Sequence, residues 1–485
     1  MARSGKKLAE AKIWLRLNME TLQRTANRGS VSTGYDIDNS LKLEADNVEY
    51  LQKANDAGTN RKTFTVSMWF KRTELANDYM TLWQGGENGE ATRLGFYGGT
   101  PKEAIWVDIG GGTGNTGTLS RSYSTQVLRD TSAFYHIVLA VDTTQATEAN
   151  RWKLWLNGEE VTSWAARNYP AQDFQCAVEA SINMHWGAYN STYYKMCGYI
   201  AECHYLDGVA KVQTDFGEYD EDSGIWIPKA YTGTYGGNGC YLNFDDSASL
   251  GADSSGNSNT FTLNNIAAAD QATDTPTNNF CTWSPLWRYL YQPIISEGGT
   301  KAGYSDSTDE NAKGSIGVIN GKWYWEAKPV GTIGSQFIGI QTANTAYTIG
   351  SQGLTQNYTM VIEPQGRYYS YSGSLSESSA GQFTALSTSS WLGIALDMDS
   401  ATKTIKYYVD GSLILTLDLI SDMQDRTVFP FLQNYESRSF YINFGGYTLN
   451  TISSAASDAN GYGTFEYAPP TGYYALCTKN LAEYG

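Results

Sequence analysis

The sequence predicts an all-β protein with two β-sandwich (jelly-roll) domains in tandem, preceded by a short N-terminal helix. Three observations support this fold class: short apolar runs alternate with turn residues about every ten residues, one strand–turn pattern occurs twice, and the composition favours strands. The 485 residues include 49 Gly, 35 Tyr and 14 Trp, and only 17% are charged. A helical protein would be richer in Leu, Glu, Lys and Ala at helical spacing.

One pattern of strand, polar link, strand and hairpin turn occurs at 134–159 and again at 391–413. In each copy an aromatic residue and a short apolar run end at an aspartate, and a second strand with alternating faces follows. The second strand ends in Asn157-Gly158 or Asp410-Gly411, dipeptides that adopt the positive φ values of a tight hairpin. We expect each copy to lie at the centre of one sandwich.

The spacing of the strands divides the chain into five parts. One strand series runs through the first half of the chain and a second through the last third, and the stretch between them includes the polar, Pro-containing segment 274–286. We expect an N-terminal helix and lead-in at 1–35, a first sandwich at 36–250, a connector at 251–312, a second sandwich at 313–447 and an extended tail at 448–485.

The first 28 residues carry seven Lys or Arg against two Glu. Leu8, Leu15 and Leu22 fall seven residues apart, and Trp14 and Met19 widen this apolar stripe. The pattern predicts an amphipathic helix. Because a single short helix is marginal in water, we expect it either to pack on the first domain or to dock onto a partner or an oligomer axis.

Charge and hydropathy exclude several classes of function. The formal net charge of -16 argues against a nucleic-acid-binding protein, since phosphate neutralisation requires Lys and Arg. No apolar run approaches the roughly 18 to 20 residues that cross a bilayer, and the N-terminus does not resemble a signal peptide. We expect a soluble protein that binds no nucleic acid, inserts in no membrane and is not exported by a cleaved signal.

The cysteines and histidines do not form a recognisable metal or nucleophile motif. No cysteine pair has the C-x-x-C spacing of a zinc site, and no G-x-S-x-G elbow is present. We expect His136, His185 and His204 to be satisfied core residues, because each lies in an apolar strand. We expect buried free thiols, while the even number leaves room for disulfides outside a reducing compartment, at Cys176, Cys197, Cys203, Cys240, Cys281 and Cys477.

Clustered oxygen ligands suggest one possible cofactor, a structural calcium ion. The candidate ligands are Asp245, Asp246, Asp253 and Asn257. The full spacing of an EF-hand loop is absent, and Asx-rich turns need no metal, so both interpretations stay open.

Recognition of a ligand by loop aromatics is the activity that the residues favour most. Tyr and Trp offer an apolar face for sugar stacking and a polar tip for hydrogen bonds, although many must be core residues. The candidates are Trp186, Tyr189, Tyr193 and Tyr194 in the first sandwich, and Tyr358, Tyr368, Tyr369 and Tyr371 in the second.

Two family resemblances add to this interpretation. Residues 40–245 resemble the concanavalin/laminin-G-type jelly rolls common in bacteriophage structural proteins, through SLKLEADNVEYLQK, TFTVSMWFKR, FYHIVLAVDTT, RWKLWLNGEEVT and GYIAECHYLDG. Residues 313–446 resemble a SPRY domain, through GKWYWEAK, FIGI, WLGIALDMDSATKTIKYYVDGS, VFPFL and YINFG in the expected order. The loops of the second region depart from the family, so no SPRY ligand carries over.

These resemblances imply a non-enzymatic bacteriophage virion protein, assembled in the host cytoplasm and exposed on the particle. As a tail fibre or fibre-like appendage it would form a homo-oligomer, with a trimer favoured, contact other virion proteins and bind a host-surface glycan or protein. The alternative that they imply is a capsid decoration or cement protein with a purely structural role.

A glycan hydrolase is a third alternative, since concanavalin-like folds include laminarinase-type enzymes with an E-x-D-x-x-E strand. The chain contains this string once, at Glu44, Asp46 and Glu49. Retaining glycosidases place two carboxyls about 5 Å apart across the sugar. On a regular strand Glu44 and Asp46 share a face and Glu49 points away, and Asp46 followed by Asn47 is typical of a turn. We therefore predict no catalytic residue.

Overall fold

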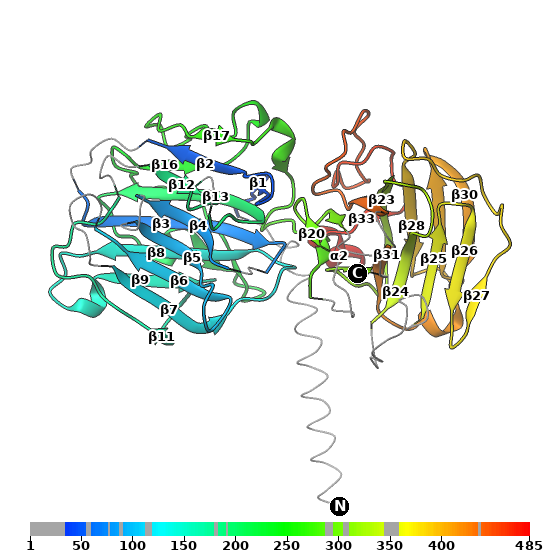
Figure 1. Ribbon diagram of the computed structural model, residues 1–485, viewed down its shortest axis with the longest axis horizontal. Coiled ribbons are helices and arrows are strands. Elements are labelled where there is room, and N and C mark those ends of the chain that lie inside the picture. The colour runs from blue at the N-terminus through cyan, green and yellow to red at the C-terminus, as the bar shows by residue number, and fades with distance from the viewer. Residues whose placement is uncertain are drawn as a thin grey trace, which may run out of the picture.

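The computed structural model describes residues 34–54, 60–75, 78–86, 91–111, 119–178, 183–190, 193–286, 294–303, 310–343, 358–434 and 438–485. These residues form two β-sandwiches that lie side by side, with β20 and α2 between them (Figure 1). The predicted all-β fold class is confirmed. The predicted docking helix, with Leu8, Trp14, Leu15, Met19 and Leu22, lies outside the described residues.

The first sandwich has two sheets with mostly antiparallel neighbours. The first sheet contains, in spatial order, β10 (Glu159–Glu160), β9 (Trp152–Leu156), β8 (Tyr135–Asp142), β3 (Thr63–Arg72), β13 (Gly198–Asp207), β1 (Ser40–Leu43) and β18 (Gln271–Ala272), with β16 (Cys240–Leu242) beside β13. The second contains β11 (Trp164–Ala166), β7 (Ser120–Val127), β6 (Ala104–Ile109), β5 (Thr92–Phe96), β4 (Met80–Gly85), β12 (Met184–Trp186), β2 (Tyr50–Lys53) and β17 (Thr262–Asn264). A separate ribbon pairs β14 (Gly217–Tyr219) with β15 (Trp226–Pro228).

The second sandwich is built in the same way. One sheet contains, in spatial order, β19 (Trp283–Ser284), β22 (Glu310–Gly314), β31 (Val428–Asn434), β24 (Phe337–Thr342), β25 (Thr359–Glu363), β26 (Arg367–Tyr371) and β27 (Leu375–Glu377). The other contains β20 (Ile295–Ser296), β21 (Lys301–Ala302), β32 (Ser439–Asn443), β23 (Lys322–Val330), β28 (Leu392–Asp397), β29 (Thr404–Val409) and β30 (Ser412–Asp418), with β33 (Tyr474–Ala475) parallel to β23. Short 3-10 turns are η1 (Glu148–Asn150), η2 (Gln213–Asp215), η3 (Ser247–Ser249), η4 (Ala268–Asp270) and η6 (Ser421–Met423).

The pattern that occurs twice in the sequence corresponds to β8–β9–β10 and β28–β29–β30. The expectation that each copy lies at the centre of a sandwich is wrong, because β10 and β30 are the outermost strands and each copy forms one edge of its sheet. Asn157 and Asp410, the first residues of the two turns, both have a φ of 47°, and the glycines after them have φ of 86° and 78°. The side chain of each of these two residues also accepts a backbone hydrogen bond near the start of the first strand of its pattern. Oδ1 of Asn157 accepts the backbone N–H of His136 at 2.8 Å, and Oδ1 of Asp410 accepts that of Trp391 at 2.9 Å.

The segment 251–312, expected as a connector, is divided between the two sandwiches. β17 pairs with β2 and β18 with β1, so its first part completes both sheets of the first sandwich. β19, β20, β21 and the start of β22 belong to the second sandwich. Two- and three-residue edge strands have too few alternating positions to be recognised in a sequence, which explains the difference.

The tail 448–485 is less extended than expected. β33 adds to the second sandwich, and α2 (Thr478–Tyr484) packs on its core through Leu481 and Tyr484. Of the three aromatic residues that we expected from the sequence to pack the tail, Phe465 and Tyr473 are buried and Tyr467 is half-buried. No helix in the described part of the chain is long and apolar enough to span a membrane.

A buried polar interface joins the two sandwiches. The ammonium group of Lys71, on β3, lies 2.7 Å from the carboxylate of Asp274 and donates to the side-chain oxygen of Asn279 at 2.8 Å. Lys71 is fully buried. Tyr447, from the second sandwich, packs in one apolar cluster with Tyr199 of β13. Because a buried charge is costly unless it is paired, loss of either Asp274 or Asn279 would leave the Lys71 ammonium with fewer partners in this interface.

Candidate functional site

The outer face of β5, β6 and β7 carries aromatic and charged side chains. Alternation along β6 places its two isoleucines and its valine in the core, and Trp106 and Asp108 on the opposite face. The strand register places Arg93 of β5 opposite Asp108 on one side and Arg121 of β7 opposite it on the other. The pairing of three strands therefore gathers these charges.

Asp108 holds the two arginines in place. Its carboxylate accepts bonds from Nε and Nη2 of Arg121 at 3.0 and 3.1 Å, and Nη1 of Arg93 lies 3.5 Å from Oδ2. Asp108 is fully buried, whereas the Arg121 side chain is 38% exposed. The hydrogen bonds to Asp108 raise the pKa of Arg121 above its usual range. The site therefore presents a fixed, charged guanidinium at the surface.

Tyr79, which precedes β4, lies at the centre of the aromatic side chains. Its ring centroid is 4.7 Å from that of Trp106, 5.0 Å from that of Tyr194 and 5.3 Å from that of Tyr97. The guanidinium of Arg121 lies 5.8 Å from the Tyr79 ring centroid and 5.6 Å from that of Trp106. Because Trp106 is only 1% exposed, it forms the floor of the site and the half-buried tyrosines form its surface.

Two further tyrosines come from the loop between β12 and β13. β4 holds this loop, since the side-chain amide of Gln84 donates to the carbonyl of Tyr189 at 3.0 Å and the backbone N–H of Thr81 donates to that of Tyr194 at 2.8 Å. Tyr194 has a φ of 56°, which is uncommon for a bulky side chain. The guanidinium of Arg93 lies 4.5 Å from the Tyr189 ring centroid.

We call this surface the tyrosine–arginine face; it consists of Tyr79, Arg93, Tyr97, Trp106, Asp108, Arg121, Tyr123, Tyr189 and Tyr194. Tyr97 and Tyr123 extend it as a stacked pair, with centroids 4.3 Å apart and an interplanar angle of 3°. Stacking rings beside fixed hydrogen-bond donors suit a ligand with both apolar faces and polar groups, such as a sugar.

Of the first group of aromatic residues predicted to bind a ligand, three lie in a surface loop as expected and one does not. Tyr189 and Tyr194 belong to the tyrosine–arginine face, and Tyr193 beside them is 57% exposed. The expectation that Trp186 lies in a surface loop is wrong. It is fully buried on β12 in the core of the first sandwich, because β12 is a central strand between β4 and β2.

The second group of predicted aromatics does not form one surface. Tyr358 and Tyr368 pack against the core of the second sandwich. Tyr369, which points to the opposite face of β26 from Tyr368, is 8% exposed and donates its hydroxyl to Glu363 at 3.0 Å. Tyr371 is half-buried at the end of the same strand.

The residues considered for calcium hold turns in the structure. Asp253 accepts three backbone N–H bonds, and Asp246 caps the start of η3. Asp245 accepts a neighbouring asparagine amide, and Asn257 donates to two backbone carbonyls. These are the contacts expected of Asx-rich turns, and calcium binding at these residues stays a prediction.

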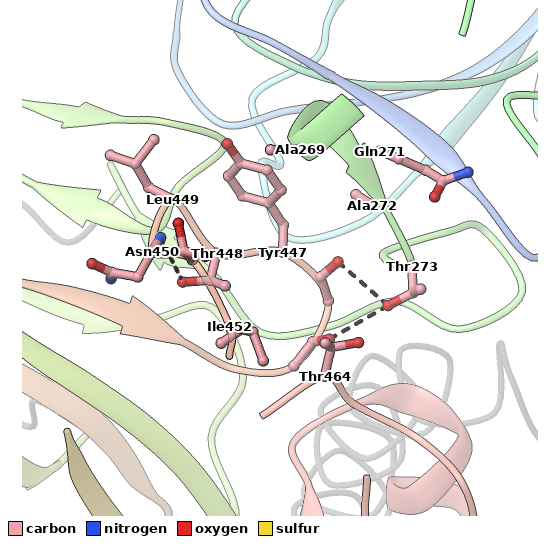
Figure 2. Close-up of a pocket in the computed structure, with 13 residues that line it drawn as sticks. Ala269, Gln271, Ala272, Thr273, Tyr447, Thr448, Leu449, Asn450, Ile452 and Thr464 are labelled. Carbon is pink, nitrogen blue, oxygen red and sulfur yellow. Dashed lines mark hydrogen bonds between the residues drawn. The ribbon is translucent and has the colours of Figure 1, made fainter. Parts of the chain in front are cut away.

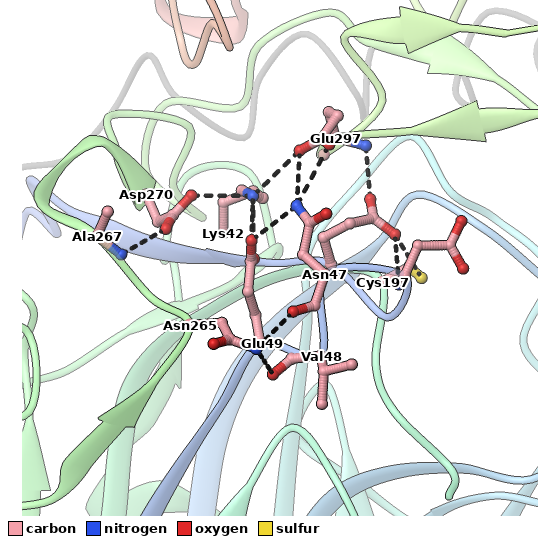
Figure 3. Close-up of polar contacts among 12 residues, drawn as sticks. Lys42, Asn47, Val48, Glu49, Cys197, Asn265, Ala267, Asp270 and Glu297 are labelled. Atoms are coloured by element: carbon pink, nitrogen blue, oxygen red, sulfur yellow. Dashed lines mark hydrogen bonds and ion pairs between the residues drawn. The ribbon is translucent and has the colours of Figure 1, made fainter. Parts of the chain in front are cut away.

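Glu44 and Glu49 of the E-x-D-x-x-E string lie in a buried network where the sandwiches meet (Figure 3), whereas Asp46 is exposed. Residues 45–48 form a turn, as expected from Asp46 and Asn47. The carboxylate of Glu49 accepts bonds from Lys42 at 2.9 and 3.0 Å, and Glu44 accepts the backbone N–H of Glu297 at 2.5 Å. Glu44 is 1% exposed and Glu49 is 3% exposed, so neither faces a space for a sugar.

Glu44 also belongs to a cluster with Glu74 and Cys197, whose potential ligand atoms all lie within 4.8 Å of one another. Among the described residues, this is the group of acidic, histidine or cysteine side chains close enough to share a metal ion. Burial raises the pKa of each member, with Glu74 at about 8 because the charge of Glu44 adds to the effect. Burial therefore favours the protonated form of each member of the cluster.

We expect the protein to become less stable as the pH rises from about 6.5 to 8. Burial raises the pKa of Glu49 and Glu326 to about 7, and burial with nearby charge raises that of Glu74 to about 8, whereas unfolded glutamates ionise near 4.5. The folded state thus binds more protons than the unfolded state up to these pKa values, and the stabilisation is lost as the pH passes through them.

Two buried histidines oppose this fall in stability, but mainly at lower pH. The measurement should therefore be made above about pH 6.5. Burial lowers the pKa of His136 to about 3 and that of His185 to about 4, so their effect declines as the pH rises above 6.5, where unfolded histidine loses its proton. Denaturant titrations between pH 6.5 and 8 test the expectation, and Glu74→Gln should flatten the slope. A rising free energy of unfolding across this window would contradict it.

The histidines and cysteines have the core positions expected of them. His136 is buried; the indole N–H of Trp226 donates to its Nδ1 at 3.0 Å, so its Nε2 carries the proton toward Ser67 Oγ, 2.9 Å away. All six cysteines are buried and free, which confirms the expectation of buried thiols.

A cleft of about 390 Å³ lies between the sandwiches, next to the polar network (Figure 2). One wall is formed by Ala269 and residues 271–273 and the other by residues 445–452, with the ring of Tyr447 between them. The residues that line it include no Asp, Glu, Lys, Arg or His. It offers fewer directed polar groups than the tyrosine–arginine face, which is the stronger candidate site.

Comparison with protein families identifies the class of the first sandwich. A family model described as the concanavalin A-like lectin/glucanases superfamily (Laminin_G_3) matches residues 46–203. The matched stretch contains the whole tyrosine–arginine face. The first sandwich therefore has a concanavalin-like jelly-roll fold. Comparison with curated proteins finds no match.

Three solved structures are similar to parts of the chain. The TRIM65 PSpry domain is 12% identical, with a TM-score of 0.25, over 34% of this chain and 89% of that chain. A putative carbohydrate binding protein from Bacteroides ovatus is 16% identical, with a TM-score of 0.30, over 47% of this chain and 59% of its own. The heptameric SAP-like pentraxin from Limulus polyphemus is 10% identical, with a TM-score of 0.26, over 37% and 80%.

Proposed function

We propose that this chain is a non-enzymatic binding protein whose first sandwich binds a glycan on the tyrosine–arginine face. The observation that carries the proposal is the layer of tyrosine rings around Tyr79, set over Trp106 and fixed beside the Arg121 guanidinium. Aromatic rings stack on the apolar faces of sugars, and the phenol and guanidinium groups bind their hydroxyls. The lectin/glucanase family match to residues 46–203 supports the same class of ligand.

The absence of catalysis is part of the proposal. Glu49 and Glu44 of the E-x-D-x-x-E string are bound by Lys42 and by a backbone N–H in a buried network, and Asp46 is exposed in the turn between them. On the face itself, Asp108 is bound by two arginines. Retaining and inverting glycosidases both need a carboxyl that protonates the leaving-group oxygen of the sugar. Asp108 is poorly suited to this role, because its buried carboxylate is already bound by two arginines.

The finer role that we propose is display on a bacteriophage particle as a tail fibre or fibre-like appendage, with the glycan on the host surface. The resemblances of residues 40–245 and 313–446 to phage-type jelly rolls and SPRY domains support it. Labelling of intact particles with an antibody against this chain tests its position, and binding of the purified chain to host cells tests recognition. A chain that binds shells and ignores cells would instead be a cement protein.

Tyr79→Ala is expected to weaken glycan binding about tenfold or more, because it removes the ring that contacts three other aromatic side chains of the face. Binding of the purified chain to an array of host-surface glycans, followed by titration of the best ligand, measures the effect. Tyr79→Phe should retain most of the affinity, since it keeps the ring.

The matched control is Tyr219→Ala, since Tyr219 is a tyrosine of β14 with 45% exposure outside the face. It should bind like the parent. Equal affinity of the parent and Tyr79→Ala would exclude the tyrosine–arginine face as the glycan site.

A further inference from the structure

We propose that the glycan bound at the tyrosine–arginine face is acidic, and that Arg121 contacts its carboxylate or sulfate group. This inference rests on the proposed function and specifies the ligand of the same site. It follows from the charge of the face, the geometry of Arg121 and the rings that surround it.

The face carries more positive than negative charge. The guanidinium groups of Arg93 and Arg121 share the single buried carboxylate of Asp108. At the rim, the exposed Asp78 accepts the backbone N–H of Tyr79, and water screens its charge more than that of a buried group. The chain as a whole has a net charge of -16, so it repels a polyanion in general. An anionic ligand would therefore bind at this face, where the two arginines attract it, and not elsewhere on the negatively charged chain.

The guanidinium of Arg121 is oriented for an anion from outside. Its Nε and Nη2 bind Asp108 side by side, and none of the described residues accepts a bond from Nη1. The side chain is 38% exposed, so a ligand reaches this group. A guanidinium held by one carboxylate keeps its charge and its plane, and binds a second oxyanion with little loss of side-chain entropy.

The aromatic rings beside Arg121 indicate the second feature of the ligand, an apolar surface that can stack on a ring. Tyr79 and Trp106 lie within 5.8 Å of the guanidinium, measured to the ring centroids, and Tyr97 and Tyr123 continue the face as a stacked pair. A free anion such as phosphate would not use these rings. A sugar that carries an acidic substituent would stack on a tyrosine and place its charge at Arg121.

The test compares glycans that differ only in charge. The parent chain is titrated with polygalacturonate and with its fully methyl-esterified form, and with dextran sulfate and with dextran, at low and at physiological salt. We expect at least one anionic probe to bind about tenfold or more tightly than its neutral counterpart, with affinity that falls as salt rises. The first pair tests a carboxylate as the ligand group and the second a sulfate.

Arg121→Gln is expected to remove the preference for the anionic probe. Arg121→Lys keeps the charge beside Asp108 without the planar fork, so it should fold like the parent and show an intermediate preference. The matched control is Arg129→Gln, since Arg129 is exposed and outside the face. Melting curves establish that each variant is folded.

The outcomes separate the inference from the proposed function. Loss of the preference in Arg121→Gln, but not in Arg129→Gln, supports the inference. A parent that binds neutral and anionic partners equally, or an anionic preference that survives in Arg121→Gln and Arg121→Lys, overturns the inference and leaves glycan binding standing. A parent that binds none of the four probes and no glycan on the host-surface array overturns both.

Discussion

Lys42→Met is expected to lower the free energy of unfolding by about 3 to 5 kcal/mol, the range for removing one partner of a buried ionic group. The Lys42 ammonium lies 2.9 Å from carboxylates of Glu49 and Asp270 and 3.3 Å from that of Glu297 (Figure 3). The Lys42 side chain is 1% exposed. Its removal would leave three carboxylates close together without a cation, at the junction of the two sandwiches.

Chemical denaturation of the full chain measures this effect. The loss should be smaller at pH 5 than at pH 8, because burial raises the pKa of Glu49 to about 7 and its protonation at pH 5 removes one of the unpaired negative charges. Lys62→Met is the matched control, since Lys62 pairs with Asp173 at 2.9 Å on the surface and should contribute at most about 1 kcal/mol. A Lys42→Met variant as stable as the control would show that the network contributes nothing to joining the sandwiches.

Glu326→Ala is expected to destabilise the second sandwich by about 3 kcal/mol and to loosen the tail, because it leaves buried donors without an acceptor. Glu326, on β23, is fully buried. Its carboxylate accepts the backbone N–H groups of Glu466 and Tyr467 at 2.8 Å, the Tyr324 hydroxyl at 3.1 Å and the Asn443 amide at 3.2 Å. The Glu326 side chain thus links residues 466 and 467 of the tail to β23.

Amide hydrogen exchange at Glu466 and Tyr467 reports the loosening, and denaturation reports the stability. Glu377→Ala is the control, because the Glu377 side chain is 46% exposed in its pair with Arg367. Glu326→Gln should fall between the two, since its amide keeps one acceptor oxygen. Unchanged exchange at residues 466 and 467 in Glu326→Ala would mean that other contacts hold the tail.

The local features of the fold could be predicted because they depend on neighbouring residues. Asn157 and Asp410 specify their hairpins by themselves, since each tolerates a φ of 47° and precedes a glycine. The same holds for the turn at Asp46 and Asn47, whose residue types alone are incompatible with a regular catalytic strand. The short edge strands β17 and β18 could not be predicted, because their pairing partners lie about 200 residues away or more.

The candidate site could be predicted only in part. Tyr189 and Tyr194 were identified as loop aromatics, whereas Tyr79, Trp106 and Arg121 were not. The sequence of β6 did contain one indication of the site. Trp106 and Asp108 alternate with the apolar core residues of this strand, and a strand face that only contacts solvent requires neither residue type. What no local pattern reveals is that β5, β6 and β7 are adjacent in the order that places two arginines around this aspartate.

The sequence by itself determined that this protein is all-β, where its main strands and hairpins lie, and that its histidines and thiols are core residues, because alternation and turn chemistry act over a few positions. Only the tertiary structure decided which carboxylates are buried between the sandwiches and which aromatic residues share a surface. Those results depend on strand order and register, which bring residues that are distant in the chain to within hydrogen-bond distance. Strand order and register cannot be inferred from any single segment of the sequence.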